Sequence, residues 1–172
     1  AAPNFVRIAP AGVEAATEAP ASVGPMFIPN DSYYGAYQWY LNNTQQYGAF
    51  MTLDADIDAP AAWNTTKGNT GIVIAVIDEG VDLTHADLAT NLVVTGYDAT
   101  GLGSGGAQAP SSDDMHGTAV AGIAAAVSNN AQGISGVCQL CRIMPVRIAY
   151  GDGNGNWIYE DAWAANGITL AY

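Results

Sequence analysis

The sequence predicts an α/β fold in which a mainly parallel sheet is flanked by helices. The run GIVIAVI at residues 71–77 is apolar and rich in β-branched residues, which is typical of a strand buried on both faces of a parallel sheet. Residues 117–127 are almost all small and apolar, which is typical of a helix buried on most of its sides. Because strands alternate with helices along the chain, we expect right-handed crossovers between parallel strands.

The remaining elements have weaker patterns. Residues 92–98 indicate a second strand and residues 142–148 a third, in which Pro145 favours an edge position or irregular pairing. A helix is expected over residues 160–172, and a short one within residues 55–63. Together these segments complete the alternation of strands and helices.

Composition indicates one domain and excludes two classes of partner. The chain has 172 residues, of which 49% are hydrophobic, enough for a sizeable core. Residues 1–28 are rich in Ala and Pro and are expected to be a linker or the tail of an upstream segment, ahead of a folded region over residues 29–172. With 4 basic against 16 acidic residues, the net charge is −12. No basic face can form, so neither nucleic acid nor an anionic membrane is expected as a partner.

Asp78 and His116 are the candidate chemical groups. Asp78 directly follows the buried strand, at the edge of the sheet where ligands gather, and His116 stands in the first turn of the small-residue helix. Taken singly, Asp78 could cap a turn and His116 could be structural. Taken together, an Asp that accepts from one ring nitrogen fixes the tautomer and leaves the other nitrogen as a general base. The small residues Gly117, Ala119, Ala121 and Gly122 are expected to let the helix approach the sheet.

Several segments resemble those of one family. AVIDEGVDLTHADL (residues 75–88) and HGTAVAGIAAA (116–126) look like the Asp and His signatures of the subtilisin-like serine peptidases, the subtilases. GISGVCQLCRIMPVRI (133–148) resembles the segment that follows the His helix in that family. PNDSYYGAYQWYLNN (29–43) resembles the start of mature subtilases, and APNFVRIA (2–9) the last strand of their propeptide. The resemblance covers nearly the whole chain in the family's order.

The resemblance implies a secreted serine endopeptidase with a partial subtilisin-like fold. Residues 29–172 would form the N-terminal part of the catalytic domain, and residues 1–28 the propeptide tail or a linker. Asp78 and His116 would be the acid and the base of an Asp–His–Ser triad that hydrolyses a protein or peptide substrate.

The family's nucleophile is not evident in this chain. The family order places Ser after His, and the only serines downstream of His116 are Ser128 and Ser135, neither in a Gly-Thr-Ser-type motif. We therefore expect the Ser in a C-terminal half that is the partner of this chain, and we expect the chain alone to be inactive. A non-catalytic subtilase-like binding module is the alternative.

The resemblance also implies substrate-binding residues. In subtilases the stretch that is here Gly153, Asn154 and Gly155 presents its backbone to the substrate as an added strand, and an aromatic residue such as Trp157 walls a pocket. A Gly-rich turn is the alternative. Glu79 stands where Ser or Thr is commoner, and it is similar to the kexin-like branch, in which this acid helps to recognise a basic substrate residue. For Glu79 we favour a solvated turn residue over that role.

A calcium site is implied in the same way. Asp87 matches the family's calcium-ligand Asp, and Asn129 in the loop over residues 127–134 is its expected partner. A structural calcium ion is therefore expected, and no organic cofactor. Two solvated loop residues are the alternative.

Cys138 and Cys141 form a single CxxC pair. With only His85 and His116 in the chain, a zinc site is improbable, and a thioredoxin-like motif would open a helix instead of preceding a strand. A disulfide that closes a short loop and two plain thiols remain. We favour the disulfide, which agrees with secretion.

Two further motifs do not fit their templates. GLGSGG at residues 101–106 matches a dinucleotide fingerprint, but Pro110 follows where a helix should open, so a surface loop is favoured over a Rossmann-type nucleotide binder. DGNGN at residues 152–156 begins like an EF-hand loop, but Trp157 and Trp163 occupy its sixth and twelfth positions.

Overall fold

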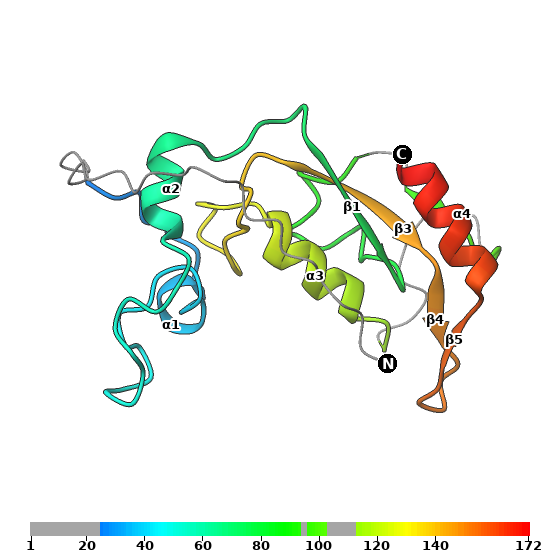
Figure 1. Cartoon of the computed structure of the whole chain (residues 1–172), viewed down its shortest axis with the longest axis horizontal. Helices are drawn as coiled ribbons and strands as arrows, with labels where there is room; N and C mark the ends of the chain where they lie inside the picture. The colour runs from blue at the N-terminus through cyan, green and yellow to red at the C-terminus, as the bar shows by residue number, and fades with distance from the viewer. Residues whose placement is uncertain (1–24, 94–95, 103–112) are drawn as a thin grey trace, which may run out of the picture.

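The structure is a computed structural model that describes residues 25–93, 96–102 and 113–172 (Figure 1). Its elements in chain order are α1 (Tyr34–Tyr37), α2 (Ala59–Thr65), β1 (Val73–Asp78), β2 (Tyr97–Asp98), α3 (His116–Ala125), β3 (Arg142–Arg147), β4 (Ala149–Gly151), β5 (Trp157–Tyr159) and α4 (Asp161–Ala171). Most of the expected N-terminal linker and of the GxGxxG segment lies outside the described residues. The short helix expected within residues 55–63 is α2, which begins where Pro60 occupies its first turn.

The main sheet is parallel, as predicted, with strand order β1-β3-β2. The register pairs Asp78 and Asp98, the last residues of β1 and β2, with Arg147, the last residue of β3. The carboxyl ends of the three strands therefore meet at one edge of the sheet. After β3, the chain forms an antiparallel hairpin of β4 and β5 beside that edge.

Pro145 lies in the central strand of this sheet, so the interpretation of an edge strand is wrong and that of irregular pairing is correct. The Ile143 N–H donates to the Asn91 carbonyl at 2.7 Å. Pro145, two residues further on, faces the same neighbour, because alternate residues of a parallel strand bond to the same side. On that side the described pairing is a single bridge between Leu92 and Ile143 and then β2, which starts opposite Val146. Pro145 falls between the two, where its missing N–H interrupts no described ladder bond.

The helices α3 and α4 cover opposite faces of the sheet (Figure 1). Val76 and Ile143 belong to the core cluster with α3, while their strand neighbours Ile77 and Val146 face Gly167 of α4. A Cβ atom at Gly167 would lie 2.7 Å from Ile148 Cγ2 and 3.0 Å from Val146 Cγ1, so a larger residue would require these side chains or α4 to move. The sheet thus lies between α3 and α4, and it is most fully buried toward the carboxyl end of β3. The described residues contain no helix long and apolar enough to cross a membrane.

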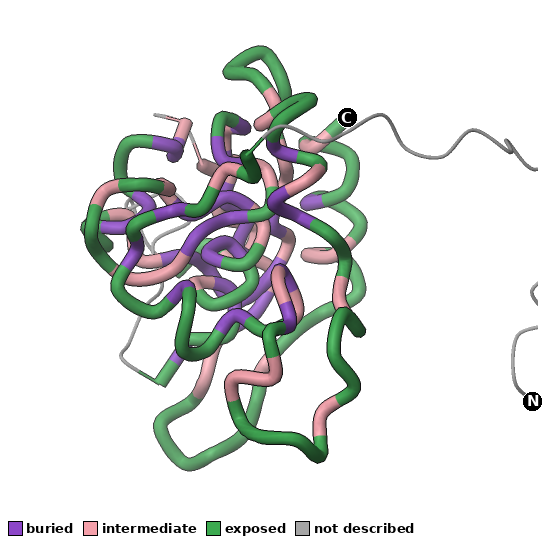
Figure 2. Tube along the Cα trace, turned by 90° about the vertical axis from the view of Figure 1, so that its left-hand side faces the viewer, coloured by how far each residue is buried: buried purple, intermediate pink, exposed green. Residues whose placement is uncertain are grey.

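The N-terminal aromatic segment packs as a second, smaller core. Tyr34, Leu41, Ala59 and Trp63 are buried together. The Trp63 indole N–H donates to the Val137 carbonyl at 2.9 Å, which joins this small core to the loop after α3. Figure 2 shows the buried stretches gathered in the middle of the trace, with exposed loops around them.

Candidate active site

Asp78 and His116 are brought together at the carboxyl edge of the sheet. The His116 Nδ1 atom lies 2.8 Å from Asp78 Oδ2 and 3.0 Å from Asp78 Oδ1, so the contact expected from the sequence is present. The Asp78 side chain is 11% exposed, while that of His116 is 71% exposed. Because a carboxylate only accepts, Nδ1 carries a proton in this contact, and in the neutral ring Nε2 is then the acceptor.

The close approach of α3 to the end of β1 depends on Gly117. A Cβ atom at this position would lie 2.1 Å from the Gly80 carbonyl oxygen and 3.0 Å from Asp78 Cβ. Ala121 and Gly122 are also buried, as expected, but Ala119 is exposed and takes no part in the contact. The glycine therefore sets the distance between the two candidate chemical groups.

Glu79 is buried, so its interpretation as a solvated turn residue is wrong. The residue is only 6% exposed. Its Oε1 atom accepts the backbone N–H of His116 at 2.5 Å, and its Oε2 atom accepts the indole N–H of Trp157 at 2.9 Å. Sequence reasoning treated Glu79 as exposed because both of its donors come from elsewhere in the chain.

Most of the predicted substrate residues line one cavity beside this pair. The cavity has a volume of about 240 Å³ and is lined by Glu79, Asp113, Asp114, Gly151, Gly153, Gly155, Asn156 and Trp157. Asn154 lies at the exposed tip of the β4–β5 turn and does not line it. Asp113 and Asp114 were not predicted. Their position directly before His116 is the signal that could have found them.

The turn over residues 152–156 is a Gly-rich hairpin turn held by Asp152. Its carboxylate accepts the side-chain amide of Asn156 at 2.8 Å and the backbone N–H groups of Asn154 and Asn156 at 2.8 and 3.1 Å. The Asn156 amide and then these backbone donors lower the pKa of the exposed Asp152 carboxyl to about 2. The turn is therefore held by hydrogen bonds within it.

Asp87 is paired with Asn130 instead of Asn129. Its Oδ1 atom accepts from Asn130 Nδ2 at 2.7 Å and its Oδ2 atom from the Ile134 N–H at 2.9 Å. Asp87 is 4% exposed, so it is not a solvated loop residue. The Asn129 side chain accepts from the Asn30 N–H at 3.3 Å instead. The described residues contain no cluster of three or more His, Cys, Asp or Glu side chains arranged to hold a metal ion.

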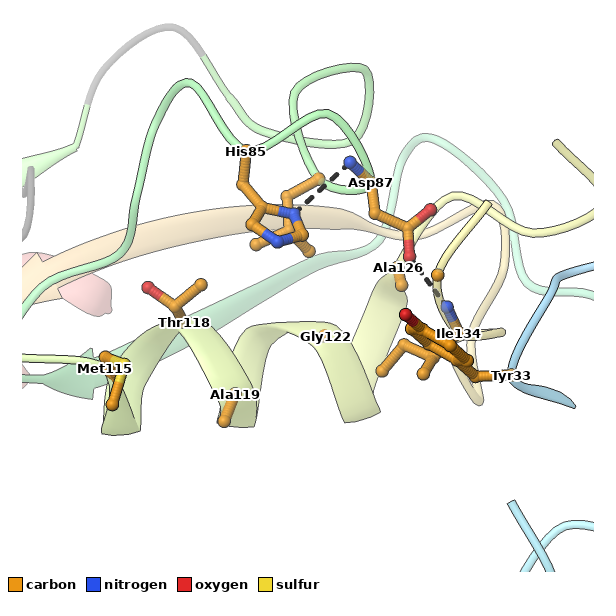
Figure 3. Close-up of a pocket in the computed structure, with 11 residues that line it drawn as sticks. Tyr33, His85, Asp87, Met115, Thr118, Ala119, Gly122, Ala126 and Ile134 are labelled. Carbon is orange, nitrogen blue, oxygen red and sulfur yellow. Dashed lines mark hydrogen bonds between the residues drawn. The ribbon is translucent and has the colours of Figure 1, made fainter. Parts of the chain in front are cut away.

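A second cavity lies along α3 (Figure 3). Its volume is about 290 Å³, and its lining includes Met115, the N-cap residue of α3, and Thr118, Ala119 and Gly122 within α3. Neither Asp78 nor His116 lines it. Neither residue lines the smaller cavity, but Glu79 does, and Glu79 follows Asp78 and accepts the His116 backbone N–H, so we place the candidate chemistry beside the smaller cavity.

Cys138 and Cys141 form a disulfide, as predicted, with their sulfur atoms 1.98 Å apart. The bond joins the start of β3 to the loop that follows α3. Gly68, with φ +83°, packs directly against it, and a Cβ atom there would lie 2.2 Å from Cys138 Sγ. The disulfide and the close-packed glycine together secure the amino end of the central strand.

The two serines after His116 are structural. The Ser128 and Ser135 hydroxyls hydrogen-bond to each other at 2.7 Å, and Ser135 is fully buried. Both lie beyond the carboxyl end of α3, whereas His116 is its first residue. A helix of 10 residues is about 15 Å long, so neither hydroxyl is within reach of the His116 ring.

The fold and the site together define an α/β domain with a parallel sheet, in which a buried Asp at a strand end contacts an exposed His at the start of a helix. A model of the subtilase family matches residues 69–172, more than half of the chain. The protein belongs to the subtilase family.

The chain is similar to several named proteins. The chain is 42% identical over 129 residues to a thermophilic serine proteinase of Bacillus sp. (strain AK1), a match that covers 75% of this chain and 28% of that protein. It is 39% identical over 145 residues to thermitase of Thermoactinomyces vulgaris, covering 84% and 44%. A calcium-dependent protease of Trichormus variabilis is 35% identical over 129 residues, covering 74% and 18%.

A solved structure agrees with the fold. The serine protease of Aeromonas sobria, in its complex with a chaperone, matches with a TM-score of 0.65 and 26% identity over 79% of this chain and 24% of that one. The chain spans less than half the length of each of the curated relatives named above.

Proposed function

We propose that this chain contributes the Asp and the His of the Asp–His–Ser triad of a serine endopeptidase. The observation that carries the proposal is the 2.8 Å contact between Asp78 Oδ2 and His116 Nδ1. A carboxylate at Nδ1 fixes the tautomer of the neutral ring and leaves Nε2 as the acceptor that a general base needs. The serine proteases among its relatives support the same chemistry.

The proposed mechanism gives the two ring nitrogens of His116 different roles. Nε2 of His116 takes the hydroxyl proton as the serine oxygen attacks the substrate carbonyl carbon. The imidazolium that results is stabilised by the buried carboxylate of Asp78 through Nδ1. The same Nε2 then gives its proton to the departing amine. We propose that the serine is carried by a C-terminal half of the domain, which is then the partner of this chain.

The 240 Å³ cavity is the proposed substrate subsite. The backbone of Gly153 and Gly155 would pair with an extended peptide beside the β4–β5 hairpin, with Asn154 at its tip, and Trp157 would wall the pocket. Glu79, Asp113 and Asp114 place three carboxylates around this space. Such a lining favours a basic substrate side chain, because opposite charge and the aromatic face both attract a cation.

We further propose that the loop around Asp87 holds a structural calcium ion. Its relative in Trichormus variabilis is named a calcium-dependent protease. Asp87 and Asp31 are both buried, and Asn130 contacts both, through its side chain and its backbone N–H respectively. Rotation of the Asn130 amide would present its oxygen to Asp87, and carboxylate and amide oxygens suit calcium. Asn130 therefore replaces Asn129 as the proposed partner.

The triad is tested by comparing residues 1–172 alone with the full-length protein, that is, this chain together with the proposed C-terminal half. Residues 1–172 alone should show no peptidase activity and no labelling by a serine-directed phosphonate, and adding the C-terminal half should restore both. His116→Ala should then lower kcat/KM by roughly four to six orders of magnitude. His85→Ala, the same change at the other histidine, should leave the rate unchanged. An active His116→Ala enzyme would show that the base lies elsewhere, and a completed protein that binds peptides without cleaving them would support a binding module.

Calcium is tested through stability. A ligand that binds only the folded state raises Tm as its concentration rises. We expect EDTA to lower the Tm of the wild type and to have little effect on Asp87→Asn. Asp54→Asn, at an exposed carboxylate, should respond as the wild type does. If EDTA leaves the wild-type Tm unchanged, no calcium is bound.

We propose that the protein is secreted, because it contains a disulfide and such bonds persist in oxidising compartments.

A further inference from the structure

One carboxylate links the helix of His116 to the substrate hairpin. Glu79 Oε1 accepts the backbone N–H of His116, 37 residues along the chain, and Oε2 accepts the indole N–H of Trp157, 78 residues along. His116 is the first residue of α3, and Trp157 is the first residue of β5. Glu79 therefore contacts both the element that carries the base and the element that walls the subsite.

The chemistry of the contact requires a carboxylate. The N-cap residue of α3, Met115, makes no side-chain cap hydrogen bond. Glu79 supplies the missing acceptor, and its negative charge is favourable at a helix N-terminus. A glutamine has one acceptor oxygen, so it would turn an NH₂ group toward either His116 or Trp157. Each carboxylate oxygen of Glu79 can accept a second hydrogen bond. Because Glu79 also lines the cavity, its negative charge still faces that space.

A second contact ties the same two elements. The Gly151 N–H, in the partner strand of the hairpin, donates to Asp114 Oδ1 at 2.6 Å, and Asp114 stands two residues before His116. In the hairpin, Gly151 is paired with Trp157. The hairpin is therefore attached to the start of α3 through both of its strands, and a displacement of Trp157 would be transmitted to the backbone of His116.

We propose that Glu79 is a positioning residue that holds the substrate hairpin and the His116 helix in a fixed relation. This rests on the function proposed above and deepens it. Glu79 does not touch the reacting atoms. It acts through Trp157 on the substrate strand and through the His116 backbone on the base, so that a correctly seated peptide and a correctly aimed imidazole occur together.

Indole resonances test the contact without any activity. The chain has four tryptophans, and the Trp63 indole, bonded to the Val137 carbonyl, serves as an internal control. In Glu79→Gln we expect the NMR signal of the Trp157 indole or of the His116 backbone amide to shift and its solvent exchange to rise by about tenfold or more, since one of the two hydrogen bonds to a charged group is lost. The Trp63 signal should stay in place. If neither the Trp157 indole nor the His116 backbone amide changes, the proposal is overturned, because one amide oxygen can keep only one of the two donors.

Trp157→Phe tests the same contact from its other side. This change removes the donor and keeps an aromatic ring, so it is independent of whether Glu79→Gln folds. We expect faster exchange of the His116 backbone amide, because Glu79 loses one of its two anchors. An unchanged His116 amide also overturns the proposal.

Kinetics of the full-length protein separate positioning from a purely structural role. Glu79→Gln should lower kcat and raise KM together, with a loss of about tenfold in kcat/KM. The double variant that combines Glu79→Gln with Trp157→Phe should lose no more kcat/KM than Glu79→Gln alone, because both substitutions remove the same Glu79–Trp157 hydrogen bond. Glu160→Gln, at an exposed acid that makes no cap bond, is the matched control and should be neutral.

Additive losses in the double variant, or a change in KM alone, refute the positioning role. A full-length protein that has no peptidase activity while the Trp157 signal still responds would instead remove the proposed function. If the full-length protein is active but the substitutions at Glu79 and Trp157 change none of these signals, only this inference is removed and the proposed function stands.

Discussion

Gly117→Ala is the substitution that separates local helix preference from tertiary packing most sharply. In an exposed helix, alanine is more stable than glycine by about 1 kcal/mol. At Gly117, however, the added Cβ would lie 2.1 Å from the Gly80 carbonyl oxygen, where an ordinary contact needs about 3.4 Å. The helix and the turn must therefore separate by about 1 Å. That movement would stretch the 2.8 Å contact between Asp78 and His116 beyond hydrogen-bonding distance.

The expected cost is that of overpacking, about 1–3 kcal/mol, and about 2–4 °C in Tm for each kcal/mol at this chain length. Thermal unfolding measures the stability, and the full-length protein should lose most of its peptidase activity. Gly35→Ala is the matched control, since no atom lies within 4 Å of a Cβ there, and it should be neutral or stabilising. If Gly117→Ala matches Gly35→Ala in Tm and retains activity, the close approach is not what sets the site's geometry.

Two further predictions concern stability. Burial opposes ionisation of Asp98, but hydrogen bonds from Arg147 and Thr100 outweigh it and lower the pKa of this carboxyl. Its contribution is therefore complete above the unfolded pKa, about 3.9, and is lost as the pH falls through the lower folded pKa. Urea unfolding from pH 6 down to about pH 2 should show a steeper loss in the wild type than in Asp98→Asn, and equal slopes would contradict this pairing. Reduction of Cys138–Cys141, which closes a short loop, should cost about 2 kcal/mol or less by thermal unfolding, and global unfolding on reduction would contradict that estimate.

The local sequence predicted well those strands and helices whose burial produces a clear run of apolar or small residues. The apolar run before Asp78 became the strand β1, and the small-residue segment after His116 became the helix α3, each within two residues of the expected bounds. Pro145 was misread in part, because a missing N–H shows only that one bond is absent. Whether the strand is central depends on neighbours that come from elsewhere in the chain.

The sequence by itself determined the α/β class, the strand end at Asp78, the helix start at His116 and the type of chemistry that the two residues can perform. Only the tertiary structure decided that Glu79 is buried and that Asp87 meets Asn130 instead of Asn129. The physical reason is the origin of the partners. The burial of a strand or helix is visible in the pattern of its own apolar residues. The environment of the Glu79 side chain depends instead on hydrogen-bond donors that folding brings from 37 and 78 residues away.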